Sequence, residues 1–168
     1  MTNINLSQFG VINFNKLEEY YNLEIDFNKN KLIIDLNFEN KTICKVEVEK
    51  INLFLKKIKE FEVQNRNFIE KDFKYGGESS DYINFFLYEL EEEEFLNIID
   101  EYSTEDLKVQ VLNKLKLIRV GLYPDGKYGA DYYGVFDYSI CVDGEPCNQL
   151  LGVKINQNGK LDHITWQS

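Results

Sequence analysis

The chain has 168 residues, 43% hydrophobic and 14% aromatic, which is enough to bury one sizeable core and too apolar for a disordered chain. Its 29 acidic and 19 basic side chains give a formal charge of -10, which argues against generic nucleic-acid binding because phosphates would be repelled. It has no apolar run of about 18 residues and no secretory pattern after Met1, so we expect a cytoplasmic protein without a membrane helix. The three cysteines stand at no metal spacing, so we expect no disulfide, metal or other cofactor.

Two alternating apolar runs near the N-terminus predict a β-hairpin. Every second residue is apolar in 21–27 and again in 32–38, and residues 28–30 have turn composition between them. A period of two indicates strands with one buried face. A shorter apolar stretch at 11–14 precedes this hairpin.

Apolar residues then recur every three or four positions, which predicts helices. We expect one helix from about residue 48 to residue 74, with a break near 62–65, and Gly76 and Gly77 after its end. Ser79 and Ser80 can cap a second helix, and a short acidic helix and a helix over 104–115 follow.

The last third returns to strand patterns separated by turns, at 117–123, 132–142, 149–156 and 161–166. Because strands and helices are segregated along the chain, the predicted fold class is α+β with an antiparallel sheet. It consists of an N-terminal β-hairpin, central helices and a C-terminal four-strand antiparallel meander. No linker divides the chain, so residues 1–168 are interpreted as a single domain; a loosely attached N-terminal hairpin is the alternative.

The negative charge is concentrated in one segment. Residues 61–107 hold 14 acidic and 3 basic side chains, whereas the segments on either side are almost neutral. The segment is either a solvated helical face or a surface that attracts a basic partner. The acidic residues that we expect to bind such a partner are Glu91, Glu92, Glu93, Glu94, Asp100 and Glu101.

The loop between the first two C-terminal strands is rich in tyrosine. Tyr128, Tyr132 and Tyr133 are candidate anchors for a protein partner, since tyrosine offers rigid contact area with a polar tip; alternatively, some of them face the core. Asp125, Asp131 and Asp137 could place oxygen ligands near this loop, but the spacing does not match an EF-hand, and a plain hairpin loop is the simpler interpretation.

Catalytic patterns are weak. His163 is the single histidine and falls within a predicted strand, which favours a structural or surface role over a nucleophile pair with a cysteine. The glycines form neither a P-loop nor a dinucleotide fingerprint. A small enzyme or ligand-binding domain centred on the 123–137 loop or on His163 is therefore an alternative hypothesis.

Four segments of the C-terminal third carry a resemblance: LIRVGLYPD (117–125), VFDYSI (135–140), NQLLGV (148–153) and GKLDHITWQS (159–168). With Phe9-Gly10 and the first strand pair, they resemble a bacterial family of domains of unknown function, number two thousand and four. Asn148 and Gln167 stand where that family usually has an aspartate and a glutamate. Some of its members resemble immunity proteins of polymorphic toxin systems. The resemblance implies a cytoplasmic protein that binds and blocks a toxin, and it supplies no catalytic residues.

The resulting hypothesis is a non-enzymatic binding protein, an immunity-type inhibitor whose acidic helical surface meets a basic protein such as a toxin. A structural module of a larger complex is the second alternative. Neither nucleic acid nor membrane is expected as a partner, and no oligomeric state is predicted.

Overall fold

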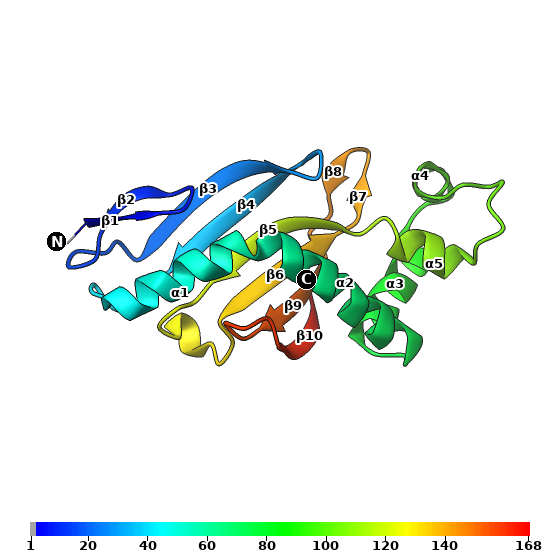
Figure 1. Ribbon diagram of the computed structural model, residues 1–168. Coiled ribbons are helices and arrows are strands. Elements are labelled where there is room, and N and C mark those ends of the chain that lie inside the picture. Colours follow the sequence, from blue (N-terminus) through cyan, green and yellow to red (C-terminus); the bar gives the residue numbers. More distant parts are fainter. Residues whose placement is uncertain (1–2) are drawn as a thin grey trace.

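The computed structural model describes residues 3–168. Two hairpins open the chain, and five α-helices separate them from the remaining strands (Figure 1). The hairpins are β1 (Asn3–Leu6) with β2 (Gly10–Asn13) and β3 (Tyr20–Phe27) with β4 (Asn30–Asn37). The helices are α1 (Lys45–Lys56), α2 (Ile58–Lys74), α3 (Glu78–Glu89), α4 (Glu92–Ile98) and α5 (Leu107–Leu112). The later strands are β5 (Lys116–Leu122), β6 (Gly134–Ser139), β7 (Cys141–Val142), β8 (Glu145–Pro146), β9 (Leu150–Ile155) and β10 (Leu161–Gln167).

The main sheet has six strands in the order β10-β9-β6-β5-β4-β3. This confirms an α+β fold with an N-terminal hairpin and central helices, but the expectation of a purely antiparallel sheet is wrong. Strands β4 and β5 pair in parallel, with Ile34 opposite Val120, so the sheet is mixed. The physical reason is the connection: the helices carry the chain from the end of β4 back to the start of β5, as a parallel pairing requires.

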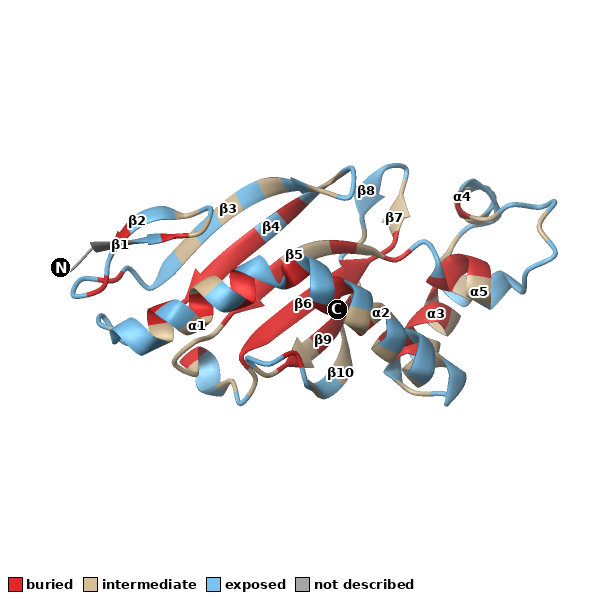
Figure 2. Ribbon diagram, in the orientation of Figure 1, coloured by how far each residue is buried: buried red, intermediate tan, exposed pale blue. Residues whose placement is uncertain are grey.

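The first two helices differ from the prediction. The expected single helix over 48–74 is divided at Lys57, whose φ of −99° and ψ of 2° leave the helical region, and no break occurs near 62–65. The division lets α1 and α2 follow the twisted sheet, and both helices contain buried apolar residues, so buried segments occur along both ribbons (Figure 2). No helix of residues 3–168 is long and apolar enough to cross a membrane.

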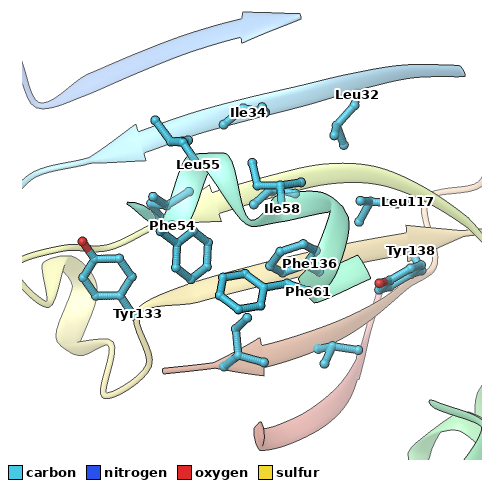
Figure 3. Close-up of a cluster of buried hydrophobic side chains, with 14 of the residues drawn as sticks. Leu32, Ile34, Phe54, Leu55, Ile58, Phe61, Leu117, Tyr133, Phe136 and Tyr138 are labelled. Carbon is cyan, nitrogen blue, oxygen red and sulfur yellow. The ribbon is translucent and has the colours of Figure 1, made fainter. Parts of the chain in front are cut away.

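Aromatic side chains join the helices to the sheet (Figure 3). The ring of Phe54 on α1 lies 4.9 Å from that of Phe61 on α2, and Phe61 meets Phe136 of β6 edge to face at 6.4 Å. All three are buried between the helices and the sheet, together with the inward residues of β4. Complete burial of such a side chain contributes about 1.5–3 kcal/mol, so this cluster is a main source of the helix–sheet packing energy.

Gly134 at the start of β6 leaves room for this aromatic packing. A Cβ atom there would lie 2.5 Å from Cζ of Phe54, and the glycine has an ordinary negative φ, so only space is at issue. We predict that Gly134→Ala lowers the free energy of unfolding by about 1–3 kcal/mol through overpacking. Urea unfolding would measure it. The double variant Gly134→Ala/Phe54→Leu should lose less than the sum of the two single variants, and simple additivity would contradict this explanation.

Candidate functional site

The acidic residues predicted from the sequence lie on α4 and the loop that follows it, at one end of the sheet (Figure 1). Glu91 to Glu93 are exposed, and Glu94 is half-buried because it closes a capping box, in which the Glu91 amide donates to Glu94 Oε2 over 3.1 Å. Carboxylates in a first turn also interact favourably with the helix dipole. The cluster therefore has a local structural role in starting α4.

The loop after α4 is held by the buried side-chain amide of Gln110, which bonds backbone groups at both ends of the loop. The Asp100 amide donates to Gln110 Oε1 over 2.9 Å, and Gln110 Nε2 donates to the Glu105 carbonyl over 3.1 Å. Gln110 is buried on α5, so both ends of the loop 100–105 are tied to that helix. The carboxylates of Asp100 and Glu101 are presented to solvent from a tethered loop.

We call residues 88–107 the acidic end. None of the ion pairs within residues 3–168 includes a carboxylate from this stretch. Four large apolar side chains are exposed between the acids, and two tyrosines are the most exposed of them: Tyr102 (94%), Tyr88 (84%), Leu107 (47%) and Leu96 (43%). Figure 2 shows α4 and its loop as mostly exposed ribbon. The acidic end thus combines uncompensated charge with uncovered aromatic area.

The candidate tyrosines lie elsewhere. Leu36 of β4 pairs with Leu122 at the end of β5, so the helices must return along the sheet to reach the beginning of β5. The acidic end therefore lies where β5 begins, and the 124–133 loop lies where β5 ends, about 20 Å of strand away (Figure 1). The structure does not combine the two predicted sets into one surface.

The three tyrosines also differ from one another. Tyr128 is exposed, with a φ of 62°, and Tyr132 is half-buried against Tyr123 at a ring distance of 5.5 Å. The ring of Tyr133 packs beside that of Phe54 at 5.3 Å (Figure 3), and the residue is 8% exposed, so its selection as a surface anchor was wrong. Burial raises the pKa of its phenol. Because side chains alternate along an extended chain, adjacent tyrosines must face opposite sides.

The other loop candidates serve local structure. The carboxylate of Asp125 accepts the amides of Glu39 and Asn40 at 2.8–3.0 Å, which ties the loop to the chain after β4. Asp137 lies within β6, and no group of three potential metal ligands gathers among the described residues. His163 lies on the edge strand β10 and bonds the carboxylate of Asp162.

Sequence reasoning missed an ionic cluster on the sheet face opposite α1 and α2. Arg119 of β5 is bound to Asp35 of β4 through two hydrogen bonds, Nε to Oδ2 at 2.6 Å and Nη2 to Oδ1 at 2.9 Å. On its other side, Nη1 donates to Asp137 Oδ2 of β6 over 2.7 Å. Tyr123 accepts a fourth bond from Nη2 at 3.0 Å. One guanidinium thus connects three neighbouring strands.

Two glycines make space for this cluster. Gly121 stands opposite Asp35 in the register, and Gly152 stands opposite Asp137. A Cβ atom at Gly121 would lie 2.5 Å from Arg119 Nη2, and one at Gly152 would lie 3.2 Å from Asp137 Oδ1. Because both glycines lack a side chain, the guanidinium and the two carboxylates can pack closely against the sheet.

Burial and charge oppose each other in this cluster. Burial lowers the pKa of Arg119, but hydrogen bonds and charge from Asp35 outweigh it, so the net pKa is raised and the guanidinium stays charged. Burial raises the pKa of Asp137, against the opposing effect of Arg119, and its Oδ1 has no hydrogen-bond partner. All but one of the five N–H donors of Arg119 are used within the chain, so the arrangement suits strand alignment better than ligand capture.

Comparison of the chain with models of known protein families, with curated proteins and with solved structures finds no match. The resemblance to a family of domains of unknown function stays a prediction.

We predict that Arg119→Met lowers the free energy of unfolding at pH 7 by about 3–5 kcal/mol, because it leaves two buried carboxylates without their cation. The loss should shrink as pH falls, because burial raises the pKa of Asp137 and its carboxylate is neutralised as it takes up a proton. Urea unfolding at several pH values measures both effects. The triple variant Arg119→Met/Asp35→Asn/Asp137→Asn should recover part of the stability at pH 7. A loss that does not change with pH would contradict the assigned charges.

Proposed function

We propose that this protein binds a basic partner protein through the acidic end. The observation that carries the proposal is that the carboxylates of residues 88–107 are ion-paired to no cation of residues 3–168, while Tyr88 and Tyr102 stand exposed among them.

Charge supports the partner's sign. An uncompensated negative field attracts a positively charged surface, raises the association rate and repels other acidic surfaces. Because these carboxylates are paired to no cation of residues 3–168, an incoming lysine or arginine breaks no existing ion pair. The partner is therefore a basic protein and not another acidic one.

The exposed side chains support a protein over a small cation. Tyrosine is enriched among residues that dominate binding energy at protein interfaces, and it loses little conformational entropy there. Tyr88 lies near the end of α3, Leu96 lies on α4 and Tyr102 lies in the tethered loop, so three short segments of the acidic end offer exposed apolar area. In this proposal these three residues replace the sequence-predicted anchors, which were Tyr128, Tyr132 and Tyr133.

An inhibitor of a basic nuclease toxin is the specific form of this function that we propose. Such an enzyme carries a positive cleft for phosphates, and an acidic surface with aromatic anchors would occupy that cleft. The resemblance to a family with immunity-like members favours the same interpretation.

The proposal is tested with the product of the neighbouring gene, purified in a catalytically inactive form, by isothermal titration calorimetry. The variant Glu93→Lys/Glu101→Lys/Glu105→Lys reverses three exposed charges and keeps the Glu91–Glu94 capping box intact. We expect its Kd to rise at least about tenfold at low salt, and its affinity to depend less on ionic strength than that of the unaltered chain.

The matched control is Glu18→Lys/Glu39→Lys/Glu60→Lys, which changes the net charge equally at exposed glutamates outside the acidic end. Its Kd should change by less than about threefold, because charges beyond a Debye length are screened. Equal weakening by both triple variants would show that net charge, and not the acidic end, governs the binding. A chain that binds no such partner would contradict the inhibitor function.

A further inference from the structure

Strand β10 forms one edge of the main sheet, and its free backbone groups can be assigned. The Ile155 carbonyl accepts the Tyr133 amide over 2.9 Å, so the backbone groups of Ile155 face β6. Along a strand between antiparallel neighbours, the backbone N–H and C=O groups of successive residues point to alternate sides. The backbone groups of Val153, two residues from Ile155, therefore face β6 too. Ile164 is paired with Val153, and its N–H and C=O therefore point away from the sheet.

The Trp166 amide supports this assignment independently. Two residues beyond Ile164, it donates to Glu78 Oε2 of α3 over 3.0 Å instead of to β9. The Glu78 carboxylate therefore occupies the outward N–H of Trp166, whereas no such contact from the described residues occupies the outward N–H of Ile164. One residue of an added strand could make two hydrogen bonds with Ile164 there.

A groove of about 500 Å³ adjoins this position, between β10 and the last turns of α2. Its apolar walls come from both elements: Phe68 and Tyr75 on the helix side, and Leu161 and Ile164 on the strand side. Tyr75 is 77% exposed. A segment that paired with Ile164 would therefore lie along apolar area that its alternate side chains can cover.

The charges along the groove indicate the occupant's sign. Asp72 also lines the groove and keeps its negative charge, but its Oδ2 is held at the start of α3, where it accepts the Ser79 amide over 2.7 Å. His163 bonds the carboxylate of Asp162. Lys71 lines the groove and is ion-paired to no carboxylate of residues 3–168. Lys71 is therefore the group of the groove with which a carboxylate of an occupant could pair.

We propose that this groove binds an extended peptide segment of a partner protein, which adds as a short strand beside Ile164. The segment places an apolar side chain between Phe68, Tyr75 and Ile164 and a carboxylate near Lys71. This surface is separate from the acidic end and selects the opposite sign of charge.

The test is a selection from a phage-displayed library of random peptides of about twelve residues, followed by titration of the enriched peptides against the full chain. Enriched peptides should share an apolar residue next to an acidic one and should shift the Ile164 amide resonance in NMR spectra. Lys71→Glu should weaken their binding at least about fivefold, and Tyr75→Ala should also weaken it.

The matched controls are Lys74→Glu, which alters an exposed lysine on the same helix, and Tyr88→Ala, which removes an exposed tyrosine of the acidic end. Each should change the peptide Kd by less than about twofold. The proposal would be overturned by no enrichment over a selection without protein, by binding that Lys71→Glu leaves unchanged, or by resonance shifts confined to β3. A dimer of the unliganded chain that Tyr75→Ala disrupts would assign the groove to a second copy and would also overturn it.

Discussion

Arg119 occupies the centre of the sheet, and its guanidinium binds carboxylates on the strands to either side. Asp35 belongs to the N-terminal hairpin, whereas Arg119 and Asp137 belong to the C-terminal meander. The bond between Asp35 and Arg119 therefore crosses the parallel pairing of β4 with β5, where the two halves of the sheet meet. Parallel pairing follows a long crossover and is slightly weaker for each residue than antiparallel pairing. A shifted pairing of these strands would separate the buried carboxylates from their cation, so the cluster disfavours other registers.

This junction determines where the rest of the molecule lies. Since β4 and β5 run in the same direction, the whole helical segment must cross from one end of the sheet to the other. Helices α1 and α2 make that return over the apolar face and form the core around Phe54 and Phe61 (Figure 3). The acidic end follows from the same constraint, because α4 and its loop are placed where β5 begins. The sheet and the first helices act as a scaffold, and the proposed contacts lie at its periphery.

Local patterns predicted the parts of the fold that depend on local physics. The alternation in 21–27 and 32–38 and the strand patterns of the last third located the strands of the main sheet. Alternation carries no information on strand direction, so the parallel pairing was missed. The Arg119 cluster was missed because Asp35 lies 84 residues from Arg119 in the sequence and Asp137 lies 18 residues away. Only the tertiary structure brings them together.

The candidate site was predictable in its charge and not in its anchors. Counting charges along the chain located the acidic end, but a tyrosine looks the same in sequence whether it is buried or exposed. Tyr133 was chosen and is buried, whereas Tyr88 and Tyr102 were passed over and are exposed. Their position in the sequence could have identified them. Tyr88 and Tyr102 are aromatic residues among the acidic side chains, and each lies near the end of an expected helix or in a loop.

The central functional claim is that residues 88–107 form the surface that contacts the partner. Hydrogen–deuterium exchange of the chain with and without the product of the neighbouring gene tests it most directly. The account predicts slower exchange in α4, in the loop 99–106 and at the start of α5, with the amides of the 124–133 loop unchanged. Protection confined to the 124–133 loop or to the sheet face around Arg119, with the acidic end unchanged, would contradict it.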